Sequence, residues 1–192
     1  MENVRLLLIS LSILIASGCA FNPQKANLTP NVNVTNSSIG NNTSVFVDVL
    51  DERVDRSLGR RGTAYGAAAE ITAEQDLAEV VKSEITRGLS HQGFIIADRA
   101  SAQSTLTIEI RALDYSTSQG FWTGGVHIKG ALKGRAKRES NQYEKMYRYE
   151  KEERVIVVPT AEANERWIND ALSETLSQLI KDTELLSFLA KH

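Results

Sequence analysis

The chain has 192 residues, a formal net charge of −2 and a single cysteine. The near-neutral charge gives no support to binding of nucleic acid or another polyanion, and one cysteine excludes an intrachain disulfide. The length is sufficient for one domain with an adequate hydrophobic core.

The N-terminus has the pattern of a secretory signal. Arg5 precedes an apolar stretch from Leu6 to Ala16, and the small residues Ser17 and Gly18 follow. A positive start, a short apolar region and small residues before a cleavage site are the parts of a signal peptide. The apolar stretch is shorter than the roughly 20 residues that a membrane-spanning helix needs. We predict a signal peptide over residues 1–18, with a buried N-terminal helix as the alternative.

The only cysteine follows this apolar stretch directly. Ala16-Ser17-Gly18-Cys19 resembles the bacterial lipobox, with Ala16 in place of the usual leucine. The resemblance implies cleavage before Cys19, a diacylglycerol on its sulfur and a third acyl chain, such as palmitate, on its amine. More than one acyl chain is needed because a single one gives only marginal membrane binding. Ala20, rather than aspartate, implies export to the outer membrane of a Gram-negative bacterium. The alternative for a lone cysteine is a small buried hydrophobic residue.

Residues 19–44 are predicted to be the acylated cysteine and a flexible tether. The stretch is rich in Asn, Thr and Ser and contains Pro23 and Pro30. A flexible chain of this length spans roughly 25–30 Å. Val32 and Val34 alternate with polar residues and indicate a short edge strand. Asn-x-Ser/Thr triplets such as Asn33-Val34-Thr35 are attributed to the composition of the tether rather than to glycosylation.

The domain is predicted over residues 45–192. Alternation of apolar and polar residues indicates strands, and apolar residues at helical spacing indicate two amphipathic helices. Thr72-Ala73-Glu74-Gln75 resembles a capping box that opens the first helix, and Gly93 ends it. The predicted elements, in chain order, are a strand from 45, a loop over 51–69, the first helix, strands over 94–97, 104–113, 126–138 and 143–158, a helix over 161–181 and a helical tail over 185–189.

The two long strands carry opposite charges on one predicted face. A turn over 139–142 joins them, and cross-strand pairs of opposite charge suit a sheet face that water wets. We therefore predict the α+β class: a two-layer sandwich with a mainly antiparallel sheet of four to five strands and two amphipathic helices on one face. The charged residues are His127, Lys129, Lys133, Arg135 and Lys137 on the first strand and Glu144, Glu150 and Glu152 on the second.

The sequence contains no recognisable catalytic pattern. His91, His127 and His192 do not stand at a metal-binding spacing, and thiolate ligands are absent if Cys19 is acylated. A nucleophile elbow, a phosphate loop and a dinucleotide fingerprint are also absent. Glu144, together with the glutamates over 150–153, is interpreted as solvated surface rather than an acid–base pair. We predict that the protein is not an enzyme and has no cofactor and no metal site.

Two segments are candidate binding surfaces. Phe121 and Trp122 lie in a glycine-flanked loop, and aromatic residues on loops are effective anchors for a partner. The alternative is that Trp122 folds back over the edge of the core. The second segment, from Asp51 to Gly66, contains Arg53, Arg56, Arg60 and Arg61. These arginines either meet an anionic headgroup or glycan, or form internal ion pairs with the neighbouring acidic residues.

Taken together, these features resemble the YajG-type family of bacterial lipoproteins. The resemblance rests on the lipobox at Cys19, the stretches Asp51-x-Arg53 and Leu58-Gly59 after a strand, "RGLSHQGF" at Arg87–Phe94, "LTIEIRALDYS" before Ser118-Gln119-Gly120, and the amphipathic C-terminal helix. It covers nearly the whole chain and implies location and fold more than activity. The two-layer plan is also similar to small lipoproteins that assist outer-membrane assembly, including the lipopolysaccharide-transport lipoprotein that plugs a β-barrel, an analogy of fold alone.

The expected function follows from the predicted anchor. We expect an outer-membrane lipoprotein that faces the periplasm and acts as a non-enzymatic binding or envelope-assembly module. Its partners are the membrane, through Cys19, and an unidentified envelope protein or glycan at Phe121 and Trp122. The alternatives are an enzyme that acts on envelope glycan or lipid, and a structural spacer.

Overall fold

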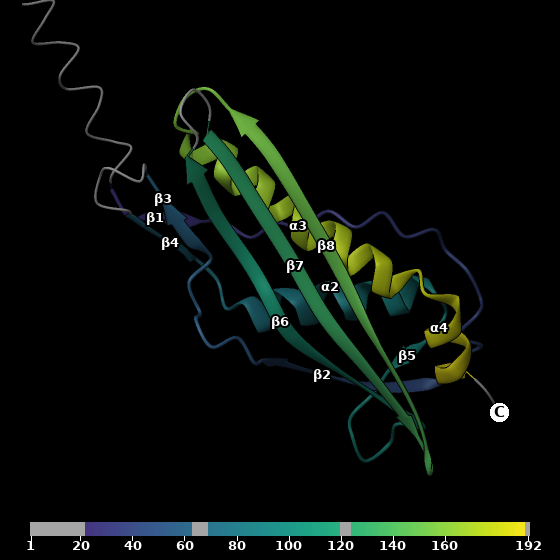
Figure 1. Cartoon of the computed structure of the whole chain (residues 1–192). Helices are drawn as coiled ribbons and strands as arrows, with labels where there is room; N and C mark the ends of the chain where they lie inside the picture. Colours follow the sequence, from purple (N-terminus) through teal and green to yellow (C-terminus); the bar gives the residue numbers. More distant parts are fainter. Residues whose placement is uncertain (1–21, 63–68, 120–123, 191–192) are drawn as a thin grey trace, which may run out of the picture.

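The computed structural model describes residues 22–62, 69–119 and 124–190. Within them, three helices cover one face of a single eight-stranded sheet (Figure 1). The strands are β1 (Gln24–Ala26), β2 (Ser44–Asp51), β3 (Gly59–Arg61), β4 (Ala69–Ala73), β5 (Ile95–Ile96), β6 (Ser104–Gln119), β7 (Gly124–Arg138) and β8 (Asn141–Val155), and the helices are α2 (Leu77–His91), α3 (Ala161–Ile180) and α4 (Thr183–Ala190).

The long strand β6 organises the sheet. On one side β7 pairs with it antiparallel along almost its whole length, and β8 pairs with β7. On its other side β2 runs parallel to the first half of β6, up to the pair of Asp51 with Ile110. The short β3 then joins β6 at the pair of Gly59 with Tyr115. The edge of β6 is therefore shared by two strands, with a break between them.

The predicted sheet is corrected on two points. It has eight strands rather than four to five, and it is mixed rather than mainly antiparallel. The parallel pairing of β2 with β6 arises because α2 carries the chain back between them, and a crossover returns the chain in the same direction. The extra strands β1 and β3 come from stretches predicted to be tether and loop, and β4 overlaps the residues predicted to open the first helix.

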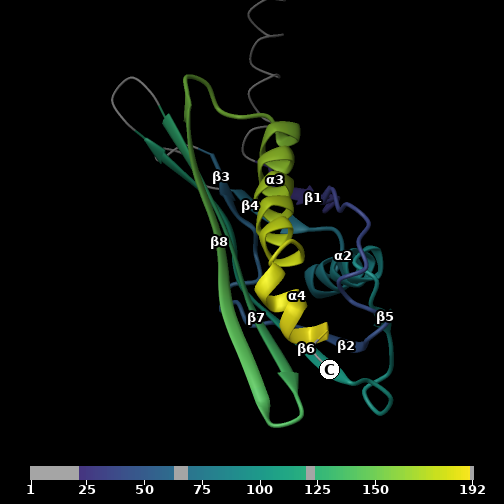
Figure 2. The ribbon, with the colours of Figure 1, turned by 90° about the vertical axis from the view of Figure 1, so that its right-hand side faces the viewer.

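The helices form one layer, as predicted. Figure 2 shows α2, α3 and α4 on the same side of the sheet, with α3 along β7 and β8. Their buried residues include Val81, Ile85, Ile168, Leu172 and Leu176, each at most 2% exposed. None of the helices among the described residues is both long and apolar enough to cross a membrane.

One glycine of β7 sets the close approach of α3. A Cβ at Gly130 would lie 2.3 Å from Thr175 Oγ1 and 3.1 Å from the carbonyl oxygen of Ala171. Thr175 Oγ1 in turn donates to this carbonyl at 2.7 Å. A side chain at position 130 would therefore require the Thr175 hydroxyl to move and the helix backbone at Ala171 to shift slightly.

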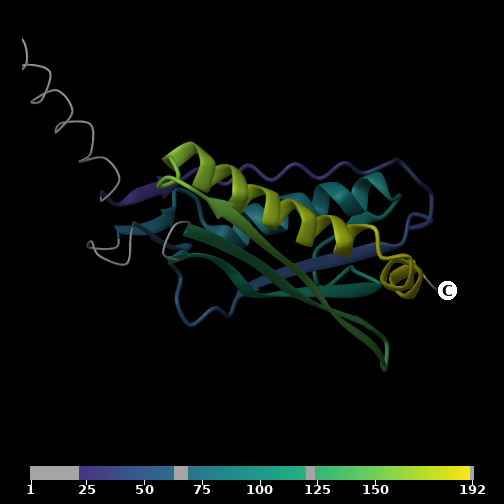
Figure 3. The ribbon, with the colours of Figure 1, turned by 45° about the horizontal axis from the view of Figure 1, so that its top comes forward.

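The segment predicted as a flexible tether is packed against the domain from Gln24 onward. In Figure 3 it runs over α3 and α2 on the side away from the sheet. The side chains of Leu28 and Val32 are each 3% exposed. Backbone amides of this segment donate to α3, from Thr29 to Asn169 Oδ1 at 2.7 Å and from Asn31 to Ser173 Oγ at 2.9 Å. Arg87 of α2 donates to the Val32 carbonyl at 2.8 Å. The ordered domain therefore begins well before Val45, and no strand forms at Val32 or Val34.

A buried polar cluster fixes the start of this segment. Gln24 Nε2 donates to the Ala161 carbonyl at 2.8 Å, and Asn164 Nδ2 donates to Gln24 Oε1 at 3.1 Å. Tyr115 OH donates to Asn164 Oδ1 at 2.6 Å, and burial raises the pKa of Tyr115 to about 12 although the nearby charge of Arg61 opposes it. Buried polar groups are stable when they pair in this way. The cluster ties β1 to the beginning of α3.

The face without helices carries the predicted ladder of charges. Lys133 Nζ and Arg135 Nε each lie 2.7 Å from a carboxylate oxygen of Glu144. Lys129 Nζ lies 3.7 Å from Glu150 Oε1, its direct partner across the strands. The prediction of opposite charges across β7 and β8 is confirmed.

Candidate functional site

A cleft opens where the edge of β6 passes from β2 to β3. Its volume is about 540 Å³. The end of β2, the connection to β3, the end of β4 and the first turn of α2 form its walls. In sheets with parallel strands, ligands bind beyond the carboxyl ends of the strands. The lining residues are Val49, Leu50, Asp51, Glu52, Arg53, Arg56, Thr72, Ala73, Gln75, Asp76, Leu77 and Ala78.

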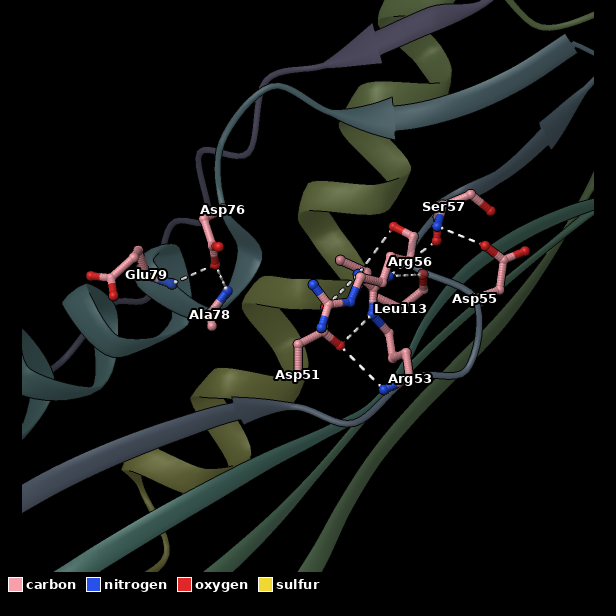
Figure 4. A network of polar contacts seen from close by, with 9 residues as sticks. All are labelled: Asp51, Arg53, Asp55, Arg56, Ser57, Asp76, Ala78, Glu79 and Leu113. Carbon is pink, nitrogen blue, oxygen red and sulfur yellow. Dashed lines mark hydrogen bonds and ion pairs between the residues drawn. The ribbon is translucent and has the colours of Figure 1, made fainter.

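Arg53 holds one wall of the cleft together (Figure 4). Its Nε and Nη2 each lie 2.9 Å from one of the two carboxylate oxygens of Asp51, a bidentate pair. The same guanidinium donates to the carbonyls of Ser57 at 3.1 Å, Arg56 at 3.2 Å and Leu113 at 3.4 Å. The Arg53 side chain is only 4% exposed. Its charge is therefore used within the fold rather than offered to a ligand.

The Asp51 carboxylate keeps its charge at neutral pH. Partial burial raises its pKa, but the hydrogen bonds and the charge of Arg53, helped by Arg56, outweigh burial and hold the pKa below the ordinary 3.8. A carboxylate that is ionised and already paired is a poor general acid or base near pH 7.

The opposite wall is the N-terminus of α2, and the chain itself caps it. Asp76 Oδ1 accepts from the backbone amides of Ala78 at 2.8 Å and Glu79 at 3.3 Å (Figure 4). Gln75 Oε1 accepts from the Leu28 amide at 2.9 Å. Two of the four amide donors that a helix N-terminus leaves open are thus occupied by a carboxylate. This arrangement disfavours an anionic ligand.

Apolar side chains and an ion pair lie around the cleft. Leu50, in its lining, is 43% exposed, and Val54, in the connection between β2 and β3, is fully exposed. Glu52 Oε2 lies 3.1 Å from Arg111 Nη1. An exposed apolar residue next to fixed polar groups is a combination found at protein–protein contacts.

The four arginines predicted as a binding group do not act together. Arg53 forms the internal ion pair that was the alternative in the sequence analysis. Arg61 is 7% exposed and donates to Gln24 Oε1 at 3.3 Å. Arg56 and Arg60 are exposed, and only the first lines the cleft. Of the two alternatives, the internal ion pair is found for Arg53, and the four arginines do not form a common anion-binding patch.

The residues singled out for function lie outside the described ranges. Cys19, Phe121 and Trp122 belong to residues 1–21 and 120–123. Lipidation at Cys19 and partner binding at Phe121 and Trp122 therefore stay predictions. Across the described ranges no group of three His, Cys, Asp or Glu side chains is arranged to hold a metal ion.

The cleft was missed because its parts come from separate segments. Gln75 and Asp76 line the same cleft as Asp51 and Arg53 only after α2 has packed on β2. The sequence signal that could have located one wall is the pair Asp51 and Arg53, two residues apart at the end of a strand. Nothing in the spacing indicates that Asp76 faces them.

The comparisons with known proteins identify a family and a fold. The family model described as "Uncharacterized lipoprotein" matches residues 30–190. The crystal structure of XCC0632 from Xanthomonas campestris shares the fold, with a TM-score of 0.55 at 16% identity over 84% of this chain and 96% of that chain. No curated protein matches this chain.

Two further solved structures are similar over much of the chain. A Helicobacter pylori protein described as a neuraminyllactose-binding hemagglutinin homolog has a TM-score of 0.47 at 10% identity, over 85% of this chain and 97% of that chain. Lipoprotein GNA1162 from Neisseria meningitidis has a TM-score of 0.30 at 13% identity, over 56% of this chain and 83% of that chain.

Proposed function

We propose that this chain, which belongs to the YajG family of uncharacterised lipoproteins, is anchored through Cys19 in the outer membrane and acts in the periplasm as a non-enzymatic binding or assembly module. The cleft between β2 and α2 carries the binding part of the proposal. Its paired charges are committed to the fold, which leaves as its contact surface the exposed Leu50 and Arg56 of its lining, together with the exposed Val54 in the same connection as Arg56. In a standard interface a few buried side chains supply most of the affinity, and arginine is enriched among them.

The anchor predicts a defined mass. The full chain isolated from its own membranes is expected to begin at Cys19 and to carry three acyl chains, whereas Cys19→Ala is expected to remain uncleaved and unacylated. Intact mass spectrometry distinguishes the two. Because the sequence contains one cysteine, no other residue can carry a diacylglycerol through a thioether bond. A wild-type chain that retains Met1 without added lipid contradicts the anchor.

The cleft predicts a contact in intact cells. With p-benzoylphenylalanine in place of Leu50, we expect ultraviolet light to produce one discrete covalent adduct with an envelope component. The matched control places the same group at Ile95, which is 51% exposed on the short edge strand β5. Val54→Asp, a substitution of a fully exposed side chain, is expected to abolish the Leu50 adduct without unfolding the domain. Equal products from positions 50 and 95, or an adduct that survives Val54→Asp, contradict a binding cleft.

The predicted loop contact is tested separately. Replacing Phe121 and Trp122 together with alanine is expected to weaken partner capture if the loop is the contact. If the double variant still captures the partner and Val54→Asp does not, the contact lies at the cleft alone. New products from peptidoglycan incubated with the full chain favour the enzymatic alternative instead.

A further inference from the structure

An apolar triplet is exposed at the end of the last strand. Ile156, Val157 and Val158 follow β8 directly, and their exposed fractions are 87%, 76% and 36%. Consecutive apolar side chains in water are unfavourable, and clusters of them mark contact with a protein or a membrane. Pro159 and the start of α3 at Ala161 come next in the chain, so the triplet connects two rigid elements.

The triplet lies at the end of the molecule where the described chain begins. Gln24 Nε2 donates to the carbonyl of Ala161, and the Asn27 amide donates to Glu165 Oε2 at 2.9 Å. Figures 1 and 2 both show β1 and the connection from β8 to α3 at this end. The first described strand and the triplet therefore lie at the same end of the molecule, although more than a hundred residues separate them in the sequence.

The packed N-terminal segment shortens the link to the anchor. A flexible tether over residues 19–44 would allow a wide range of distances between the domain and the membrane. The residues from Gln24 onward are instead packed against the domain. The five residue-to-residue steps from Cys19 to Gln24 span at most about 18 Å when fully extended. The opposite end of the molecule, at β5, is farther away, because the 16 residues of β6 alone extend over about 50 Å.

From the short link and the exposed triplet we propose that this end of the domain rests on the lipid bilayer, with Ile156, Val157 and Val158 inserted among the headgroups. The proposal rests on the lipid anchor of the proposed function and adds an orientation to it. Apolar side chains at a membrane surface lie about 5–10 Å into the boundary between headgroups and acyl chains. In this orientation β5 and the beginning of β6 point away from the membrane.

Site-directed labelling tests the orientation. The full chain with Val157→Cys is isolated in its acylated form and labelled with a polarity-sensitive fluorophore. Cys19 is the only native cysteine and its sulfur is acylated, so the introduced thiol alone reacts. The labelled protein is reconstituted in vesicles of phosphatidylethanolamine and phosphatidylglycerol that contain brominated acyl chains, which quench fluorophores within the bilayer. Ile95→Cys, an exposed apolar position at the opposite end, is the matched control.

We expect the label at position 157 to be quenched severalfold more than the label at position 95, with a blue-shifted emission. Equal and weak quenching at both positions in a chain whose acylation is confirmed by intact mass overturns the orientation and leaves the anchor standing. A chain that proves unacylated overturns the anchor and this inference together. Strong quenching at position 95 alone places the opposite end on the membrane and overturns the inference as well.

Discussion

Gly59→Ala is expected to lower the free energy of unfolding by about 3–5 kcal/mol, since both backbone strain of about 1–3 kcal/mol and lost backbone hydrogen bonds of about 1 kcal/mol each contribute. Gly59 has a φ of +126°, a backbone angle that residues other than glycine rarely adopt. A Cβ there would lie 1.8 Å from the carbonyl oxygen of Tyr115. The obstacle is backbone, so no rotamer change relieves it.

The damage would spread because β3 is short and joins two parts of the sheet. The Tyr115 amide donates to the Leu58 carbonyl at 2.7 Å, and the Leu58 amide donates to the Ile71 carbonyl at 2.7 Å. Moving Gly59 away from Tyr115 breaks the first bond and strains the second. A loss of this size is a large part of the 5–15 kcal/mol that stabilises a typical domain.

Gly93→Ala is the control for backbone conformation alone. Gly93 also has a positive φ, of +84°, but a Cβ there would lie 3.1 Å from its nearest atom, the carbonyl oxygen of Ser37. Its cost is expected to be about 1–2 kcal/mol, from conformation with little collision. Urea unfolding of both variants, followed by circular dichroism, measures the difference. A Gly59→Ala chain as stable as Gly93→Ala would show that β3 is not held at Tyr115.

The elements with strong periodicity were predicted from the sequence. The apolar stripe of the helix from Ala161 and the strict alternation from Ser104 each mark a buried face, and both elements form. The predicted turn at Glu139 also forms, between β7 and β8. Such patterns are local, so one segment contains the whole signal.

The short strands and the packed N-terminal segment could not be predicted in this way. β1 and β3 have three residues each, too few to show a period. Leu28 and Val32 are apolar residues in a mainly polar stretch, and both are buried once this segment packs on the helices. The capping box was also wrong: Thr72 is in β4, and Asp76 is the residue that caps α2. A nearby aspartate that accepts from two amides competes directly with a predicted threonine cap.

The proposed orientation on the membrane bears on the predicted loop contact. Gln119 and Gly124, which flank Phe121 and Trp122, pair with each other, and Gly124 also pairs with Val155, the residue before the apolar triplet. If this end rests on lipid, a protein partner at Phe121 and Trp122 must share the surface with the bilayer. The cleft between β2 and α2 extends toward the same end, because Thr72 and Ala73 of its lining pair with Lys25 and Ala26 of β1.

The second large effect is expected from Arg53→Ala, at about 3–5 kcal/mol, the usual cost of breaking a buried ion pair by removing one partner. The substitution leaves the Asp51 carboxylate and the carbonyls of Ser57, Arg56 and Leu113 without the guanidinium that now binds them. Arg53→Lys is expected to recover only a part of the loss, because one ammonium cannot reproduce the bidentate pair and reach all three carbonyls. Arg56→Ala, in the same connection, removes an exposed side chain and is expected to change stability by less than about 0.5 kcal/mol.

The pH dependence of unfolding identifies the cause. In the wild type the pKa of Asp51 is lower in the folded state than the ordinary 3.8, so the ionised carboxylate contributes stability above about pH 4 that is lost as the pH falls through the folded pKa. In Arg53→Ala, burial still raises the pKa of Asp51, but the hydrogen bonds and the charge of Arg53 that lower it are gone. The loss of unfolding free energy at acid pH should therefore disappear. Unfolding free energies measured from pH 2.5 to 7 for both chains separate the two cases. A parallel pH dependence in wild type and variant would show that Asp51 and Arg53 are not coupled, and Arg53 would then hold the cleft wall through its carbonyl contacts alone.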